Sequence, residues 1–129
     1  MTEPEWLVSE AVEVLHDRSL SEFGGPPGVR DRGLLESALQ RPINRFHYEG
    51  LNDLPALAAT YAAAVSANHP FVDGNKRAAF HAMTLFLRAN GLRLNADTGE
   101  ASAAIYALAA GELDVEQLTE WVRRNIQTG

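Results

Sequence analysis

The chain has 129 residues, 46% of them hydrophobic, which suits one globular domain with its own core, and we expect residues 1–129 to form that single domain. It contains no cysteine, which excludes disulfide bonds and thiolate chemistry, and its formal net charge of −6 disfavours nonspecific binding to nucleic acid or to anionic membranes. No apolar run approaches the roughly 20 residues of a membrane span, and the acidic residues 1–5 are unlike a signal peptide, so we expect a cytoplasmic protein.

The N-terminal third of the chain predicts two helices. The first is expected over residues 4–20, where apolar side chains recur on one face. The glycine- and proline-rich residues 23–28 then break any helix. Asp31 is placed to cap a second helix over residues 32–40, and Pro42 is expected to stop it.

The middle of the chain contains a segment without helical periodicity, followed by an alanine-rich helix. Residues 43–53 show no helical stripe but contain the aromatic residues Phe46 and Tyr48 and a glycine, Gly50, which predicts a short hairpin or flap. The alanine-rich residues 54–67 follow and predict a third helix. Small side chains all round such a helix indicate that its neighbours pack closely against it.

Three more helices are expected in the second half, so the predicted fold is all-α with about six helices. The fourth covers residues 75–89. The fifth begins at Asp97 and ends at Gly111, and the sixth begins at Asp114. Each of these two aspartates is followed three residues later by Glu or Gln, which is the spacing of a capping box.

The stretch between the third and fourth helices carries the most chemical information. Residues 69–77 are His-Pro-Phe-Val-Asp-Gly-Asn-Lys-Arg. Gly74 permits a tight turn, and the free N–H groups of the helix start that follows, together with the charges of Lys76 and Arg77, favour a bound phosphate. The stretch is not a P-loop, because the GxxxxGK[ST] pattern and the preceding strand are missing.

Two further side chains in this stretch suggest a reaction. Asp73 lies two residues before the anion-binding turn, where a carboxylate commonly holds Mg²⁺ beside phosphates. His69 lies at the end of the preceding helix and could take a proton from an attacking hydroxyl. The residues alone also allow purely structural roles, in which His69 only ends a helix and Asp73-Gly74 only forms a turn. Two cations at a helix start are electrostatically unfavourable, however, and that local conflict favours a functional role.

Residues 69–77 resemble the signature of Fic domains, HPFx[DE]GNGRxxR, and are even more similar to that of the Doc-type branch, HxFxD[AG]NKR. The likeness covers about residues 15–124 and includes the segments 15–17, 24–31, 34–39 and 85–91. On this basis the chain is identified as a member of the Fic/Doc family.

The resemblance implies a compact helical fold that binds an ATP-like nucleotide at this loop. His69 would be the general base, Asp73 would hold Mg²⁺, and Phe71 would mainly pack into the core. The residues that would cradle the phosphates are Gly74, Asn75, Lys76 and Arg77. The flap that would align the target protein by edge pairing contains Phe46, His47 and Tyr48.

The motif departs from the Fic pattern at two positions. Lys76 stands where Fic domains have glycine, and Phe80 stands where they have a second arginine. The two positions are one turn apart on one helix face. In the Doc-type branch the γ-phosphate of ATP is transferred, whereas Fic enzymes transfer AMP. We therefore expect a protein Ser/Thr kinase, with an AMP transferase and a catalytically idle nucleotide-binding module as the alternatives.

The resemblance also implies partners. Doc-type proteins are toxins of toxin–antitoxin pairs, with elongation factor Tu as the implied target and arrest of translation as the result. Fic proteins that restrain themselves carry an [ST]xxxE[GN] helix. Here only Glu49 precedes a Gly or Asn, and Arg45 stands four residues before it, so we expect restraint by a separate, Phd-like antitoxin. No membrane and no direct nucleic-acid partner is expected.

Overall fold

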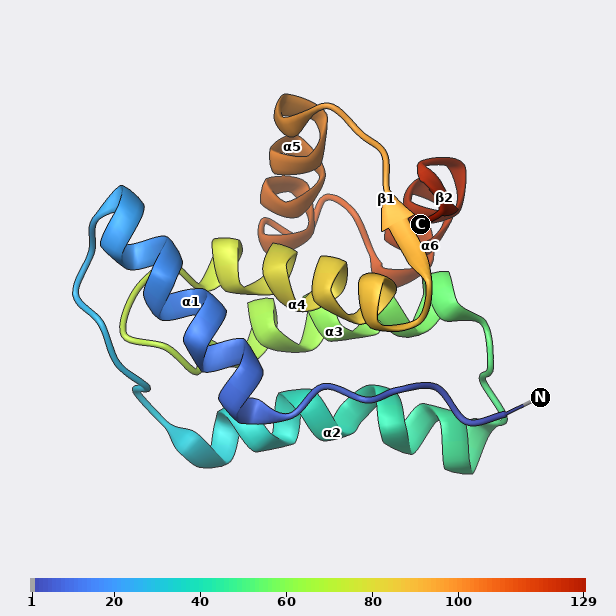
Figure 1. Cartoon of the computed structure of the whole chain (residues 1–129), viewed down its shortest axis with the longest axis horizontal. Coiled ribbons are helices and arrows are strands. Elements are labelled where there is room, and N and C mark those ends of the chain that lie inside the picture. Colours follow the sequence, from blue (N-terminus) through green and yellow to red (C-terminus); the bar gives the residue numbers. More distant parts are fainter. Residues whose placement is uncertain (1) are drawn as a thin grey trace.

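The computed structural model describes residues 2–129 and shows a mostly helical domain with two short strands (Figure 1). The elements in chain order are α1 (Ser9–Phe23), α2 (Arg32–Glu49), α3 (Leu54–Asn68), α4 (Asn75–Ala89), β1 (Leu92–Leu94), α5 (Thr98–Ala109), α6 (Val115–Arg124) and β2 (Ile126–Thr128). The prediction of an all-α class with six helices is confirmed. Within residues 2–129 no helix combines the length and the apolar character that crossing a membrane would require.

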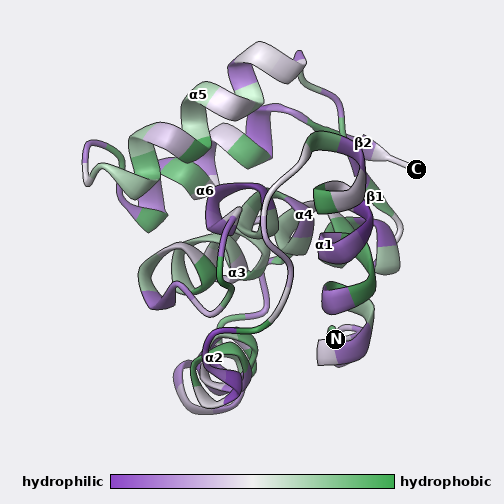
Figure 2. Cartoon of the chain, turned by 90° about the vertical axis from the view of Figure 1, so that its left-hand side faces the viewer, coloured by the Kyte–Doolittle hydropathy of each residue, from purple (hydrophilic) through white to green (hydrophobic). Residues whose placement is uncertain are grey.

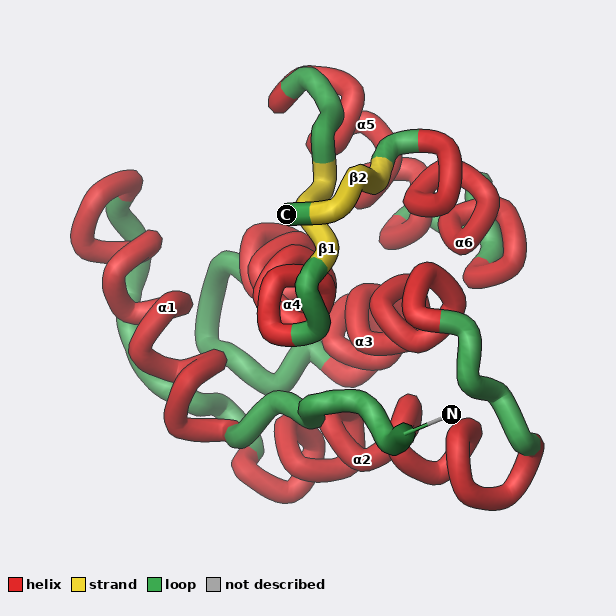
Figure 3. The backbone as a smooth tube through the Cα atoms, turned by 45° about the vertical axis from the view of Figure 1, so that its right-hand side comes forward, coloured by secondary structure: helices red, strands yellow, loops and turns green. Residues whose placement is uncertain are grey.

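Helix α3 is the centre of the molecule. Eleven of its 15 residues are buried, and it lies between α2 and α4, with α6 on a further side (Figure 3). Alanine makes this possible, because small side chains let neighbouring helices approach from several directions. The larger side chains Leu57, Tyr61 and Val65 fill the remaining space and are completely buried, as are Met83 and Phe86 of α4.

Helix α1 packs against α4 with one face only. Its buried residues are Val12, His16, Ser19 and Leu20. Figure 2 shows hydrophilic and hydrophobic colours alternating along its turns, as expected for a helix with one face towards solvent. This packing brings the end of α1 next to the start of α4.

The predicted first helix was placed too early in the chain. Residues 2–8 are extended, and α1 begins only at Ser9. The side chain of Asn90 holds the Glu5 backbone, accepting from its N–H at 2.8 Å and donating to its carbonyl at 3.0 Å. The Leu7 N–H donates to the hydroxyl of Tyr61 at 3.1 Å. These bonds take the place of helical ones and tie the N-terminal segment to α3 and α4.

The prediction of a non-helical flap in residues 43–53 was wrong. Helix α2 continues through the buried Pro42 to Glu49 and ends at Gly50, which is left-handed with φ of 69°. Two contacts keep the helix going beyond the proline. Arg45 donates to the buried hydroxyl of Thr60 at 2.8 Å, and Phe46 packs edge-on against the ring of Trp6 at 5.6 Å. This tertiary packing outweighs the local cost of a proline inside a helix.

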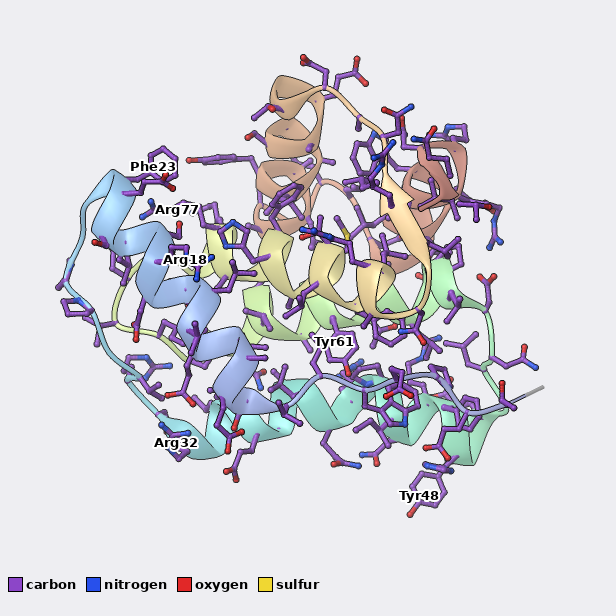
Figure 4. The ribbon with its side chains drawn as sticks, in the orientation of Figure 1. Arg18, Phe23, Arg32, Tyr48, Tyr61 and Arg77 are labelled. Carbon is purple, nitrogen blue, oxygen red and sulfur yellow. The ribbon has the colours of Figure 1, made fainter. Side chains whose placement is uncertain are left out.

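The residues assigned to the flap therefore lie on the last turns of α2. Phe46 is turned to the core, while Tyr48 is exposed. Figure 4 shows Tyr48 at the end of the molecule opposite to Arg77. His47 is bound to Glu3 at 3.2 Å. Within residues 2–129 the paired strands lie elsewhere, after the motif: β1 pairs antiparallel with β2, and Leu94 lies opposite Ile126.

Candidate active site

A cleft of about 1140 Å³ opens between the end of α1, the start of α4 and one face of α5. This is large enough for a nucleotide, since pockets for small ligands typically hold about 300–1,000 Å³. The motif lines it with His69, Val72, Asp73, Gly74, Asn75, Lys76 and Arg77. The helices around it add Ser19, Phe23, Phe80, His81, Thr98, Ala101, Ser102, Ile105 and Tyr106. The structure thus brings the predicted base, carboxylate and phosphate-binding residues to one cleft.

His69 ends α3 in an unusual backbone conformation. Its φ of 48° and ψ of 55° are left-handed, and within residues 2–129 it is the one residue other than glycine with positive φ. Its N–H donates to the carbonyl of Val65 at 3.2 Å, which closes the helix. The side chain is exposed and lies in the wall of the cleft, so a reacting hydroxyl can reach the imidazole.

The loop that follows His69 is held by an extended segment of chain. Val29 and Phe71 form an isolated antiparallel bridge, and the Val72 N–H donates to the carbonyl of Gly28 at 3.1 Å. Phe71 itself is buried, with 2% of its surface exposed. Its side chain anchors the loop in the core, while Val72 and Asp73, which follow it, line the cleft.

His16 of α1 supports the same loop, a contact that the residues around it in the sequence do not indicate. Its Nε2 lies 2.9 Å from the carbonyl oxygen of Asp73, which can only accept, so Nε2 carries the proton. The imidazole packs against the ring of Phe71, with 4.0 Å between centroids. Burial lowers the pKa of His16 below its ordinary value, while the hydrogen bond that Nε2 donates to the Asp73 carbonyl opposes that shift.

Asp73 presents its carboxylate to the cleft. The side chain is exposed, and a Cβ on Gly25, whose φ of 122° already favours glycine, would come within 2.7 Å of its Oδ2, so a side chain there would push the carboxylate aside. Among the described residues no group of three or more potential metal ligands comes together. A single carboxylate nevertheless suits Mg²⁺, which completes its shell with water and substrate phosphates. Asp73 fits the role of that one protein ligand.

The start of α4 offers backbone donors to an anion. Gly74 is the N-cap, with φ of 74°, and no side chain caps the first N–H groups of the helix. The side chain of Asn75 is already engaged with the loop: its Oδ1 accepts from the Phe71 N–H at 3.0 Å, and its Nδ2 donates to the Phe71 carbonyl at 3.1 Å. The part of Asn75 available to a phosphate is therefore its backbone N–H.

The two cations of the motif each lie near an aromatic ring. Lys76 Nζ is 5.2 Å from the ring centre of Tyr106 on α5. The guanidinium of Arg77 is 5.9 Å from the ring centre of Phe23 on α1, and it donates to the carbonyl of Gly24 at 3.3 Å. Figure 4 shows Arg77 and Phe23 together at the same end of the molecule. Both cations line the cleft, Lys76 beside an aromatic ring and Arg77 beside a ring and one backbone carbonyl, and these contacts leave most of their N–H donors unused.

The chain is similar in sequence to proteins of one known family. The Fic/DOC family matches residues 6–87, more than half of the chain. The chain belongs to the Fic/Doc family. It is 37% identical over 115 residues to the protein kinase doc of Escherichia phage P1, covering 89% of this chain and 90% of the relative. It is 44% identical over 78 residues to the toxin Doc of Mycolicibacterium smegmatis, covering 58% of each. The chain is thus homologous to a Fic-type protein kinase.

Some residues of the Fic/Doc cleft escaped the sequence analysis. Phe23 and Tyr106 line it from helices that lie far from the motif in the sequence. His16 contacts it through a backbone carbonyl 57 residues away. The aromatic character of Phe23 and Tyr106 is visible in the sequence, but it does not indicate that their helices meet at the motif. Phe46, His47 and Tyr48, by contrast, are not among the residues of the cleft.

Proposed function

We propose that this protein is a Mg²⁺-dependent kinase that transfers the γ-phosphate of ATP to a Ser or Thr hydroxyl of a target protein, elongation factor Tu. The observation that carries the proposal is the convergence on one cleft of His69, Asp73 and a helix start with two cations. Base, metal ligand and phosphate site are the parts that phosphoryl transfer requires.

In the proposed reaction the acceptor oxygen forms a bond to the γ-phosphorus, while the bond from that phosphorus to the β–γ bridging oxygen breaks. ADP leaves with that electron pair, and His69 accepts the hydroxyl proton. The N–H groups at the start of α4, with Lys76 and Arg77, stabilise the negative charge on the phosphates. Mg²⁺, when bound at Asp73, neutralises further phosphate charge.

Transfer of AMP is the second candidate, and the distribution of positive charge favours the kinase over it. Phe80 lines the cleft one turn into α4, where Fic enzymes have an arginine. The cations that α4 contributes to the cleft, Lys76 and Arg77, are therefore confined to its first turn. An idle nucleotide-binding module would have no use for the base and the metal carboxylate that the cleft contains.

We also propose that the protein acts in the cytoplasm as the toxin of a toxin–antitoxin pair and is restrained by a Phd-like antitoxin. The similarity to a protein named toxin Doc supports this. The chain lacks the [ST]xxxE[GN] pattern of self-inhibited Fic proteins. Arg45 stands at the position of the inhibitory Ser or Thr, and its side chain is bound to Glu49 and Thr60 within α2 and α3.

The test is to incubate the protein with elongation factor Tu, Mg²⁺ and ATP and to weigh the target by intact mass spectrometry. We expect a gain of about 80 Da, the mass of one phosphoryl group. His69→Ala is expected to slow it by about 100-fold or more, because it removes the base. His47→Ala is the matched control, since His47 is a half-exposed histidine outside the cleft.

Each outcome is informative. A gain of about 329 Da would identify AMP transfer instead. An equal loss of transfer rate in the His69→Ala and His47→Ala variants would contradict the role of His69 as the base. No gain with the wild-type protein would refute elongation factor Tu as the target, and a screen of other proteins with radiolabelled ATP would then decide between another target and an idle module.

A further inference from the structure

The left-handed backbone of His69 needs an external hold. Residues other than glycine adopt this conformation at a cost in free energy, and they keep it only where the surroundings impose it. The direction of the imidazole follows from that backbone. Whatever fixes the carbonyls at the end of α3 therefore also fixes the position of the base.

Arg30 supplies that hold. Its Nε donates to the carbonyl of His69 at 2.8 Å, and its Nη2 donates to the carbonyl of Asn68 at 3.1 Å. These are carbonyls at the end of a helix, which have no partner within the helix. A cation is favoured there by the helix dipole, and the planar fork of arginine can serve both oxygens at once.

The backbone of Arg30 is itself fixed to the same loop. The N–H groups of Arg30 and Asp31 both donate to the carbonyl of Pro70, at 2.7 Å and 3.1 Å. Asp31 caps α2 by accepting from the Leu34 N–H at 3.0 Å. The start of α2 and the end of α3 are therefore joined through Arg30 on both sides of His69. Arg30 does not line the cleft, so its side chain acts on the reaction through the backbone carbonyls that it holds, those of Asn68 and His69.

We infer that Arg30 is a positioning residue for the base: its guanidinium fork holds the carbonyls of Asn68 and His69 and so keeps the imidazole of His69 aimed into the cleft. The inference rests on the proposed function for its effect on rate. Its structural part, the hold on the His69 backbone, stands independently of which group is transferred.

The test compares three variants of the full chain. Arg30→Met keeps the length of the side chain but removes every donor, and Arg30→Lys restores one donor and the charge. Arg32→Met is the matched control, because Arg32 is an exposed neighbour that pairs with Glu13 on α1 at 2.9 Å. We expect Arg30→Met to lower kcat by about 10- to 100-fold with the KM for ATP changed less than about twofold, because a misplaced base slows the reaction without weakening substrate binding. Arg30→Lys should recover part of the loss.

A second measurement needs no activity. The His69 amide is bonded to the Val65 carbonyl, and its hydrogen exchange, followed by NMR, should become about 10-fold faster in Arg30→Met but not in Arg32→Met. If the wild type transfers nothing, the proposed function fails, and this exchange rate alone decides on Arg30. Unchanged exchange, an unchanged kcat, or an equal effect in the Arg32 variant would overturn the inference.

Discussion

Two histidines have pKa values lowered by their surroundings and by the motif: His16, which is buried on α1, and His81, which is half-buried on α4. Burial is the main cause that lowers the pKa of His16 and of His81, and the charge of Arg77 acts in the same direction on both. His16 also lowers the pKa of His81. The Nδ1 atoms of both rings are buried without a hydrogen-bond partner among the described residues. Neither site offers a good place for a positive charge.

The pH dependence of stability follows from these two pKa values. Because the folded-state pKa of each lies below the ordinary value of about 6.5, the folded protein binds fewer protons than the unfolded chain. The contribution of these two neutral histidines to the free energy of unfolding is therefore fully present above about pH 6.5. It is lost as the pH falls through their lowered folded-state pKa values. The urea concentration at the midpoint of unfolding should decrease when the pH is lowered from 7.5 to 5.5. The decrease should be smaller in a His16→Gln, His81→Gln double variant. A wild-type midpoint that rises on acidification would contradict this assignment.

Sequence distance explains which site residues could be predicted. The motif from His69 to Arg77 is contiguous, so its chemistry is visible in one stretch of chain. Arg30 and His16 act on backbone carbonyls 39 and 57 residues away. Nothing in the local pattern around either residue indicates those contacts, because a backbone acceptor leaves no mark on the sequence.

At the scale of the elements, local sequence patterns predicted helix ends correctly where no tertiary contact opposed them. The capping box at the start of α6 is confirmed: Asp114 accepts from the Gln117 N–H at 2.8 Å, and the Gln117 side chain accepts from the Asp114 N–H at 2.9 Å. The proline rule failed in α2, because Pro42 is buried and the turns after it are held by contacts with α3 and with Trp6. Such contacts are invisible to a rule that considers neighbouring residues only.

The capping box gives a prediction for α6. Asp114→Ala should lower the free energy of unfolding by about 1 kcal/mol, because the Gln117 N–H at the helix start loses the carboxylate that accepts from it. Urea denaturation measures this, with Glu112→Ala as the control, since Glu112 lies just before the helix and is exposed. The activity should stay unchanged, because Asp114 is not in the cleft. Equal stability of the two variants would argue against the cap.

At the scale of the whole molecule, α3 should be the most protected part. Its amides are covered by α2, α4 and α6, and Leu57, Tyr61 and Val65 are fully buried. We expect these three amides to exchange hydrogen only through global unfolding, with a free energy equal to that from urea denaturation. Amides of α1, which packs with one face only, should exchange through smaller openings. Native-state hydrogen exchange measures both, and an α3 that opens more easily than α1 would contradict this picture.

The contacts around the motif imply an order of assembly during synthesis. The hydrogen bonds that residues 69–77 make with other segments all lead to earlier parts of the chain, among them His16, Gly24, Gly28 and Arg30. The later helix α5 adds only the far wall of the cleft and Tyr106 beside Lys76. A ribosome releases the chain from its N-terminus, so these hydrogen-bond partners of the motif have already emerged when the motif does. The cleft receives its last wall only when α5 follows.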